Sequence, residues 1–270
     1  MSTGFLSVNA NQIGLIAAAL SIVAFSLSYA LLRQQTRPIR TAALALLALL
    51  SIPSVLFAVY YLHVLPEWAW FYTLRSWRCS EMLALILGCA GGAVATLLPR
   101  CLLALPLFAV ISVAIIPYMK PFLGPLPDDV FTERWQGDAC LQSTSSTCGP
   151  ASVSTILKRL GEAPSEFSAA RASFSYVGGT EAWYLARYVR SKGFVARFDF
   201  RETFVPSAGL PAVVGVRLGS VGHFIAVLAM NGDRITFADP LRGEENLPLS
   251  EFLHRYEFTG FHMVLSLIHI

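Results

Sequence analysis

The sequence has few charged residues, and this scarcity is uneven along the chain. Only 14% of its 270 residues are Asp, Glu, Lys or Arg, whereas soluble domains are usually about 25% charged. The deficit is concentrated in residues 1–120, while the rest of the chain has the composition of an ordinary globular domain. The sequence therefore predicts two regions in different surroundings, one in lipid and the other in water.

Basic clusters and cysteine motifs are also missing. The net formal charge is only +3 and no block of Lys and Arg occurs, which argues against a nucleic-acid partner. The five cysteines lack the spacing of metal ligands and are too few and too scattered for a disulfide scaffold. They are Cys79, Cys89, Cys101, Cys140 and Cys148. We therefore expect no nucleic acid, no metal and no organic cofactor.

Four apolar stretches in residues 1–120 are long enough, or nearly so, to cross a bilayer as helices, which takes about 20 residues. They cover residues 13–32, 41–62, 82–98 and 102–118. The third is short and contains Gly88, Gly91 and Gly92, and small residues let another helix approach closely. We interpret them as packing within one chain rather than as a dimerisation motif. The last two stretches are expected to be two spans, with a tight hairpin or re-entrant excursion as the alternative.

The charged residues between the spans predict how the chain is oriented. No positive residue precedes the first stretch, so it does not resemble a cleavable signal peptide. The loop after it carries Arg33, Arg37 and Arg40, which places that loop in the cytoplasm and the N-terminus outside. Four spans then return the chain to the outside near Lys120, whereas an odd number would reverse this. We expect a multi-pass protein of the plasma or inner membrane.

Aromatic residues crowd the segment 63–81, as is typical of a helix at a membrane surface. The segment contains Trp68, Trp70, Phe71, Tyr72 and Trp77. In the predicted orientation it lies outside, on the side of the C-terminal half.

A stretch rich in proline, residues 121–129, ends the membrane region. We therefore divide the chain into a transmembrane domain (1–120), a linker (121–135) and a C-terminal domain (136–270).

Cys148 begins a predicted helix in the C-terminal domain. Apolar residues recur after it at helical spacing, at Val153, Ile156, Leu157 and Leu160. Pro150 suits a first helical turn, and Gly161 suits the end of the helix. A cysteine at a helix N-terminus faces the positive end of the helix dipole, which stabilises a thiolate. This position favours a nucleophile over a buried structural cysteine.

After a second helical pattern at 180–192, the periodicity changes to that of strands. Strands are expected at 195–200, 211–218, 223–229 and 234–239, and Asn231-Gly232 predicts a two-residue hairpin turn between the last two. His223 begins one strand of this hairpin and Asp239 ends its partner, so their side chains are expected to meet at the end away from the turn. Helices followed by an antiparallel sheet predict an α+β domain.

These residues together resemble the C39 peptidase family of papain-like cysteine peptidases. The resemblance covers about residues 136–268 and rests on motifs in the order of that family, which are Gln142, Cys148-Gly149, Gly161, Gly222-His223, Asp239-Pro240 and Gly243. It implies a papain-like peptidase domain, so that with the four apolar stretches we expect an α-helical transmembrane bundle of about four spans followed by an α+β papain-like cysteine peptidase domain with an antiparallel sheet. Well-known members remove leader peptides after a Gly-Gly pair and are fused to an ABC transporter. This chain contains no GxxxxGK[ST] nucleotide-binding motif.

The resemblance also implies a role for each of four residues. Cys148 is the nucleophile, His223 the general base and acid, Asp239 the residue that orients the imidazole, and Gln142 a donor to the oxyanion. Three other histidines, His254, His262 and His269, are expected to be surface or sheet residues. Cys140 is expected to be a buried structural cysteine, with reversible pairing to Cys148 as the alternative.

Three functions fit this reading. The leading hypothesis is a membrane-anchored cysteine peptidase that cleaves a peptide or protein near the bilayer. The second is acyl transfer or amide hydrolysis on a lipoprotein or lipid through an acyl-Cys148 intermediate. The third is a catalytically inactive binding module.

Overall fold

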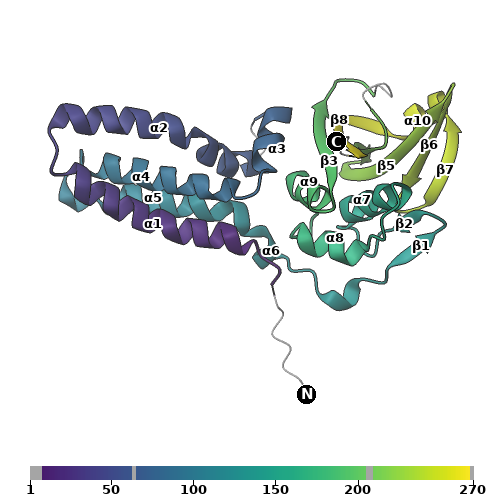
Figure 1. Cartoon of the computed structure of the whole chain (residues 1–270), viewed down its shortest axis with the longest axis horizontal. Coiled ribbons are helices and arrows are strands. Elements are labelled where there is room, and N and C mark those ends of the chain that lie inside the picture. The colour runs from purple at the N-terminus through teal and green to yellow at the C-terminus, as the bar shows by residue number, and fades with distance from the viewer. Residues whose placement is uncertain (1–7, 63–64, 205–208, 268–270) are drawn as a thin grey trace, which may run out of the picture. The chain divides into compact units, whose positions relative to one another are not determined.

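The structure is a computed structural model that describes residues 8–62, 65–204 and 209–267 (Figure 1). The chain forms two compact units. The helical unit consists of Ala10–Pro66 and Arg78–Phe122. The sheet unit consists of Met1–Asn9, Glu67–Trp77 and Leu123–Ile270. His269 and the first two residues of the predicted interfacial segment, 63 and 64, lie outside the described residues.

The helical unit is built from apolar helices joined by short 3-10 turns. Its helices are α1 (Gln12–Leu32), α2 (Arg37–Val59), α4 (Ala84–Ala95) and α5 (Ala104–Ile115), and its 3-10 turns are η1 (Tyr60–Leu62), η2 (Ser80–Leu83), η3 (Arg100–Leu102) and η4 (Ile116–Tyr118). The short helix α6 (Lys120–Leu123) follows.

Three helices among the described residues are long and apolar enough to cross a membrane, as predicted. They are Gln12–Leu32, Arg37–Val59 and Arg100–Tyr118. The predicted third span is shorter than expected, because α4 has only 12 residues. A fourth span results only if Ala69–Arg75 and Ser80–Ala95 form one broken span. The chain thus has three to four apolar helices before its second half, which is compatible with membrane anchoring.

The glycines of α4 pack against α1. A Cβ atom at Gly88 would lie 2.1 Å from the Ser21 carbonyl oxygen, and one at Gly92 would lie 2.3 Å from that of Phe25. Only glycine fits at such distances, so these positions bring two helix backbones together. The structure agrees with packing of the small residues within one chain.

The sheet unit contains a six-stranded antiparallel sheet in the order β3-β8-β4-β5-β6-β7. These strands are β3 (Phe194–Phe200), β4 (Ala212–Leu218), β5 (Val221–Asn231), β6 (Arg234–Asp239), β7 (Gly243–Pro248) and β8 (Glu257–Leu267). A smaller sheet pairs β1 (Arg134–Gln136) with β2 (Ala139–Leu141). The helices of the unit are α3 (Ala69–Arg75), α7 (Cys148–Arg159), α8 (Glu166–Ala172), α9 (Ala182–Ser191) and α10 (Leu249–Arg255), and η5 (Asp128–Val130) is a 3-10 turn. This is the α+β architecture with an antiparallel sheet that the sequence predicts.

The hairpin between β5 and β6 differs from the prediction by one residue. Asn231 pairs with Arg234, so the turn consists of Gly232 and Asp233 rather than of Asn231 and Gly232. Gly232 has φ +61°, and glycine at the first central position is what a type II′ turn requires. A register shift between Val227 and Ala229 accompanies this turn.

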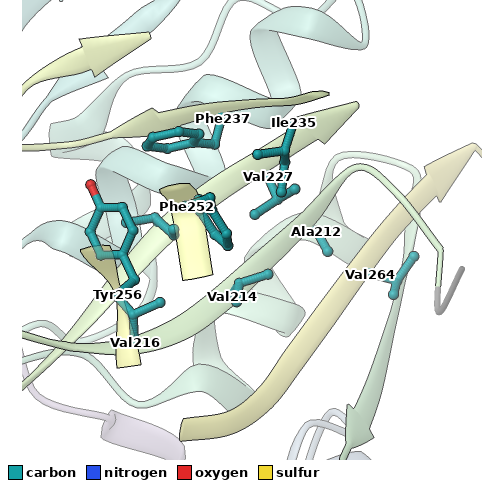
Figure 2. Close-up of a cluster of buried hydrophobic side chains, with 10 residues drawn as sticks. Ala212, Val214, Val216, Val227, Ile235, Phe237, Phe252, Tyr256 and Val264 are labelled. Carbon is teal, nitrogen blue, oxygen red and sulfur yellow. The ribbon is translucent and has the colours of Figure 1, made fainter. Parts of the chain in front are cut away.

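One face of the sheet carries the main apolar core, which α10 covers. Alternate residues of neighbouring strands point to this face, as the two-residue period of strands requires. Figure 2 shows them around Phe252 of α10; the cluster comprises Ala212, Val214, Val216, Ile225, Val227, Ile235, Phe237, Phe252, Tyr256 and Val264. Helices α7 and α9 pack against β5 and β3. The core therefore fixes the strands on which His223 and Asp239 lie.

Helix α3 belongs to the sheet unit although it lies between two apolar helices in the sequence. Its Tyr72 is 4% exposed and its ring lies 5.0–5.9 Å from the rings of four aromatic residues, which are Trp183, Phe198, Phe200 and Phe261. Arg75 is fully buried and donates a hydrogen bond to the Tyr184 hydroxyl over 3.1 Å. The opposite side of the helix exposes Trp70. The sheet unit is therefore completed by a segment that the linear domain division assigns to the transmembrane domain.

Replacement of Tyr72 by alanine is expected to destabilise the sheet unit by about 3–5 kcal/mol, the usual effect of removing a buried aromatic side chain. The effect is measurable as faster amide hydrogen exchange in β3 and β8 of the full-length protein in detergent. Trp70→Ala is the matched control, because Trp70 is 52% exposed and surface substitutions usually change stability by less than about 0.5 kcal/mol. Equal protection in Tyr72→Ala and Trp70→Ala would show that α3 is not part of this core.

Candidate active site

Cys148 is the first residue of α7 and is partly exposed. Its own backbone N–H belongs to the first turn, where N–H groups have no partner inside the helix. The last turn of α7 carries Lys158 and Arg159, which complement the negative end of the dipole. The sulfur and a free N–H are thus placed together at the positive end of a 12-residue helix.

Gly149 allows α7 to lie close to α9 and β5. A Cβ atom at this position would be 2.8 Å from Leu185 Cδ1 and 3.3 Å from Phe224 Cδ2. Ser152, one turn further along the helix, donates a hydrogen bond to the Phe224 carbonyl over 3.1 Å. The helix that carries Cys148 is therefore fixed to the residue that follows His223.

His223 and Asp239 are in contact, as the hairpin geometry predicts. His223 Nε2 lies 2.8 Å from Asp239 Oδ1, His223 is 7% exposed, and Asp239 is fully buried. Asp239 accepts two further hydrogen bonds, from the Leu241 N–H over 2.9 Å and from the Tyr256 hydroxyl over 2.7 Å. His223 also interacts electrostatically with Cys148, which helps to raise the pKa of His223. Because Nε2 contacts Asp239, the other ring nitrogen, Nδ1, is the one available to the sulfur.

The electrostatics of this group favour a charged imidazole. Burial lowers the pKa of His223, but hydrogen bonds with Asp239 and Cys148 outweigh it and raise the pKa to about 9. Burial raises the pKa of Asp239, yet its hydrogen bonds from His223, Leu241 and Tyr256 lower it overall. At neutral pH the arrangement therefore holds an imidazolium between a carboxylate and the thiol group.

Gln142 follows β2 and lies beside the end of β6. Its backbone N–H donates to the Pro240 carbonyl over 2.9 Å, which ties it to the residue after Asp239. Its side-chain Nε2 donates to the Thr144 carbonyl over 2.8 Å. The amide has a second N–H, and its buried Oε1 accepts no hydrogen bond from a described residue. The side chain is thus held in one orientation with a donor to spare.

A buried carboxylate fixes the loop between Gln142 and Cys148. Glu166 of α8 is fully buried and accepts from the Ser143 N–H over 2.8 Å and from its hydroxyl over 2.5 Å. Thr147, also fully buried, accepts from the Thr144 N–H over 3.1 Å. These contacts hold both the carbonyl that orients Gln142 and the residue before Cys148.

The structure joins His223 and Asp239 by a hydrogen bond, gives His223 an electrostatic interaction with Cys148, and ties the backbone of Gln142 to Pro240, the residue after Asp239. The other titratable candidates lie elsewhere. His254 is exposed on α10. His262 is fully buried in β8, where its ring stacks on Phe204 and burial lowers its pKa. Cys140 is buried and unpaired, and its backbone N–H donates to Thr155 Oγ1.

Two residues of this region were not predicted from the sequence. Tyr256 and Glu166 are far from the motif residues in the chain, and neither lies in a spacing typical of catalytic groups. What identifies them is that a polar side chain is buried and hydrogen-bonded, and burial is known only from the fold. Among the described residues, no group of three His, Cys, Asp or Glu side chains is placed to hold a metal ion.

Comparison with known proteins gives an independent result. The model of the Peptidase C39 family matches residues 138–266. An uncharacterised protein of Methanothermobacter marburgensis is 33% identical over 125 residues, which are 46% of this chain and 79% of that protein. The probable functional amyloid protease FapD of Pseudomonas aeruginosa is 27% identical over 44% of this chain and 57% of its own length.

The peptidase domain of Streptococcus ComA, a bifunctional ABC transporter of a quorum-sensing pathway, has a similar solved structure. Its TM-score is 0.42 at 20% identity, covering 47% of this chain and 96% of that domain. The residues matched by the family model include Gln142, Cys148, His223 and Asp239.

Proposed function

The chain belongs to the Peptidase C39 family, and from this we propose that it is a membrane-anchored cysteine peptidase. Its substrate is a peptide or protein close to the bilayer, and its catalytic group is Cys148, His223 and Asp239. The single observation that carries the proposal is the buried contact of 2.8 Å between His223 and Asp239, next to Cys148 at the start of α7, which interacts electrostatically with the same imidazole.

In the proposed reaction, the Cys148 thiolate attacks the carbonyl carbon of the scissile peptide bond. The negative charge that forms on the carbonyl oxygen is stabilised by the free N–H of Gln142 and by the backbone N–H of Cys148. His223 then donates a proton to the leaving amine as the C–N bond breaks, which leaves a thioester on Cys148. Neutral His223 takes a proton from water, the water attacks the thioester, and the acid product leaves.

Asp239 keeps the imidazole in place during both steps and stabilises its charged form. Its own charge is maintained by three hydrogen bonds. A fully buried carboxylate without such donors would be costly to ionise. The short contacts at Asp239 therefore support its proposed role as the residue that orients His223.

We further propose that the catalytic unit lies outside the cytoplasm. Three separate stretches form the sheet unit: Met1–Asn9, Glu67–Trp77 and Leu123–Ile270. Asn9 donates to the Arg171 carbonyl over 2.6 Å, and α3 is packed in the aromatic core of the unit. Segments of one compact unit lie on one side of a membrane.

The assembly of the sheet unit from three segments of the chain constrains the number of membrane spans. The chain passes through α1 and α2 between the first two stretches, and through α4 and α5 between the last two. Each pair must then cross the membrane twice or not at all, which favours an even number of spans. Arg33, Arg37 and Arg40 lie between α1 and α2, and basic loops are retained in the cytoplasm. The sheet unit is therefore assigned to the opposite side.

Mass spectrometry of the covalent intermediate tests the proposed reaction. Rapid denaturation of the wild-type protein in native membranes is expected to trap a peptide acyl group on the Cys148-containing fragment. A fatty acyl mass at Cys148 would replace peptide hydrolysis by acyl transfer from lipid. An unmodified Cys148 under all conditions that permit substrate turnover would contradict a thioester mechanism of either kind. His223→Ala, which lacks the proposed acid and base, is the matched control and is expected to remain unmodified.

A further inference from the structure

We infer that Tyr256 is a positioning residue of the catalytic site, extending the group Cys148, His223 and Asp239 by one further hydrogen bond. The inference rests on the proposed function, because it assigns Tyr256 a task in that reaction. Tyr256 does not touch the thiol or the imidazole. It acts through the carboxylate of Asp239.

The geometry gives each oxygen of the Asp239 carboxylate its own donors. Oδ1 accepts from His223 and from the Leu241 N–H, whereas Oδ2 accepts from the Tyr256 hydroxyl over 2.7 Å. Without Tyr256, Oδ2 would have no hydrogen bond from a side chain among the described contacts of Asp239. Because Asp239 is fully buried, solvent cannot readily replace the lost donor.

The Tyr256 side chain is held in place by packing in the apolar core. The residue follows α10 directly and is 3% exposed. Its ring lies 5.4 Å from that of Phe252 and 5.7 Å from that of Phe237. Figure 2 shows the ring inside the apolar cluster and the hydroxyl at its edge. The aromatic packing therefore aims the hydroxyl at Asp239 before any substrate binds.

The titratable and charged neighbours of Asp239 and Tyr256 come from four elements, α7, β5, β7 and α10. His223 of β5 interacts with Asp239 and with Cys148 of α7, and Arg255 of α10 interacts with Tyr256. Arg255 donates to Glu245 of β7 over 2.6 Å and to Glu251 over 3.2 Å, within its own helix. Its charge is thus largely balanced by two carboxylates, so Tyr256 is the neutral donor between this surface network and the buried carboxylate.

Tyr256 also remains a donor throughout the pH range in which the site functions. Burial raises the pKa of its hydroxyl, and the hydrogen bond to Asp239 raises it further, while Arg255 lowers it in part. The hydroxyl therefore keeps its proton well above the pKa of about 9 of His223. Loss of this donor frees the Asp239 carboxylate to rotate away from His223, which weakens the hydrogen bond that stabilises the imidazolium.

The test is Tyr256→Phe in the full-length protein in detergent, with the rate of Cys148 alkylation by iodoacetate measured from about pH 5 to about pH 10, a range that includes the ordinary pKa values of histidine and cysteine. Iodoacetate is an anion, so a neighbouring imidazolium accelerates its reaction with Cys148. The alkylation rate therefore falls at alkaline pH where His223 loses its proton, and this fall is the alkaline limb of the profile. In the wild type this limb is expected near pH 9. In Tyr256→Phe it is expected about one unit lower, which corresponds to a tenfold loss of imidazolium stabilisation.

Tyr188→Phe is the matched control. The Tyr188 hydroxyl is buried in α9 and forms no hydrogen bond with a described residue, so its removal is expected to leave the profile unchanged. A second comparison uses Asp239→Ala as the background. If Tyr256 acts through Asp239, Tyr256→Phe has no further effect there, even if either variant is less stable.

An alkaline limb in Tyr256→Phe at the wild-type position would overturn the inference, as would an additional shift in the Asp239→Ala background. The readout requires no peptide substrate. A wild-type protein with the expected profile but without peptide cleavage would contradict the proposed function alone. A protein that cleaves peptides but whose Tyr256→Phe profile is unchanged would contradict the role of Tyr256 alone.

Discussion

Cys148→Ala is expected to abolish cleavage of every substrate, with a loss of at least about 10⁶-fold in kcat, the scale seen when a nucleophile is removed from a preorganised catalytic group. Alanine cannot form the thioester, and the other cysteine of the sheet unit, Cys140, is not placed to replace Cys148. Cys140 is buried in β2, where burial raises its pKa to about 12. The measurement compares the peptides released from membranes of wild-type and variant cells.

Cys140→Ala is the matched control for this result, because it removes a thiol from the same unit without removing the proposed nucleophile. It is expected to retain cleavage, apart from the modest loss of stability that follows deletion of a buried side chain. Unchanged processing in Cys148→Ala would refute the peptidase. Loss of processing in Cys140→Ala with normal folding would indicate that the two thiols act together.

His223→Ala is expected to lower kcat by about as much as Cys148→Ala, and the double variant is expected to be no worse than either single one. The imidazole supplies the proton to the leaving amine, so its removal disables the same step as removal of the sulfur. His254→Ala provides the control, since His254 is exposed on α10. Additive losses in the double variant would mean that Cys148 and His223 do not work as one unit.

The sequence was most informative where a local pattern determines the structure. The helix after Cys148 was predicted because apolar spacing, Pro150 and Gly161 all agree, and Gly161 has φ +91° as a helix-ending glycine often does. The proximity of His223 and Asp239 follows from the hairpin, whose two strands place them at the same end. The shift of the turn by one residue did not disturb this, because a tight turn at Gly232 still joins the same two strands.

The sequence was least informative where distant segments meet. Tyr256 reaches Asp239 across 17 positions, and Glu166 holds Ser143 from a helix of only seven residues. No periodicity predicts either contact, because both depend on how α8 and α10 pack against the sheet. The inclusion of α3 in the sheet unit was missed for the same reason. Its aromatic residues predicted a membrane-surface helix, while one side of that helix is buried in the core.

The composition of the sheet unit has a consequence for its relation to the membrane. Glu67–Trp77 enters the unit from the chain between two apolar helices, and Leu123 enters it directly after α5 and the turn that follows. The catalytic group is therefore built on a unit that has several connections to the apolar helices.

One experiment tests the central claim most directly: labelling of Cys148 in intact cells by a membrane-impermeant thiol reagent near the ordinary pKa of histidine, about pH 6.5, in wild type and in His223→Ala. We predict rapid labelling in the wild type and much slower labelling in the variant, because in the proposed site His223 stabilises the thiolate and the sheet unit is proposed to lie outside the cytoplasm. Labelling by a permeant reagent alone would place the unit in the cytoplasm. Slow labelling by both reagents, unchanged in His223→Ala, would contradict the catalytic group.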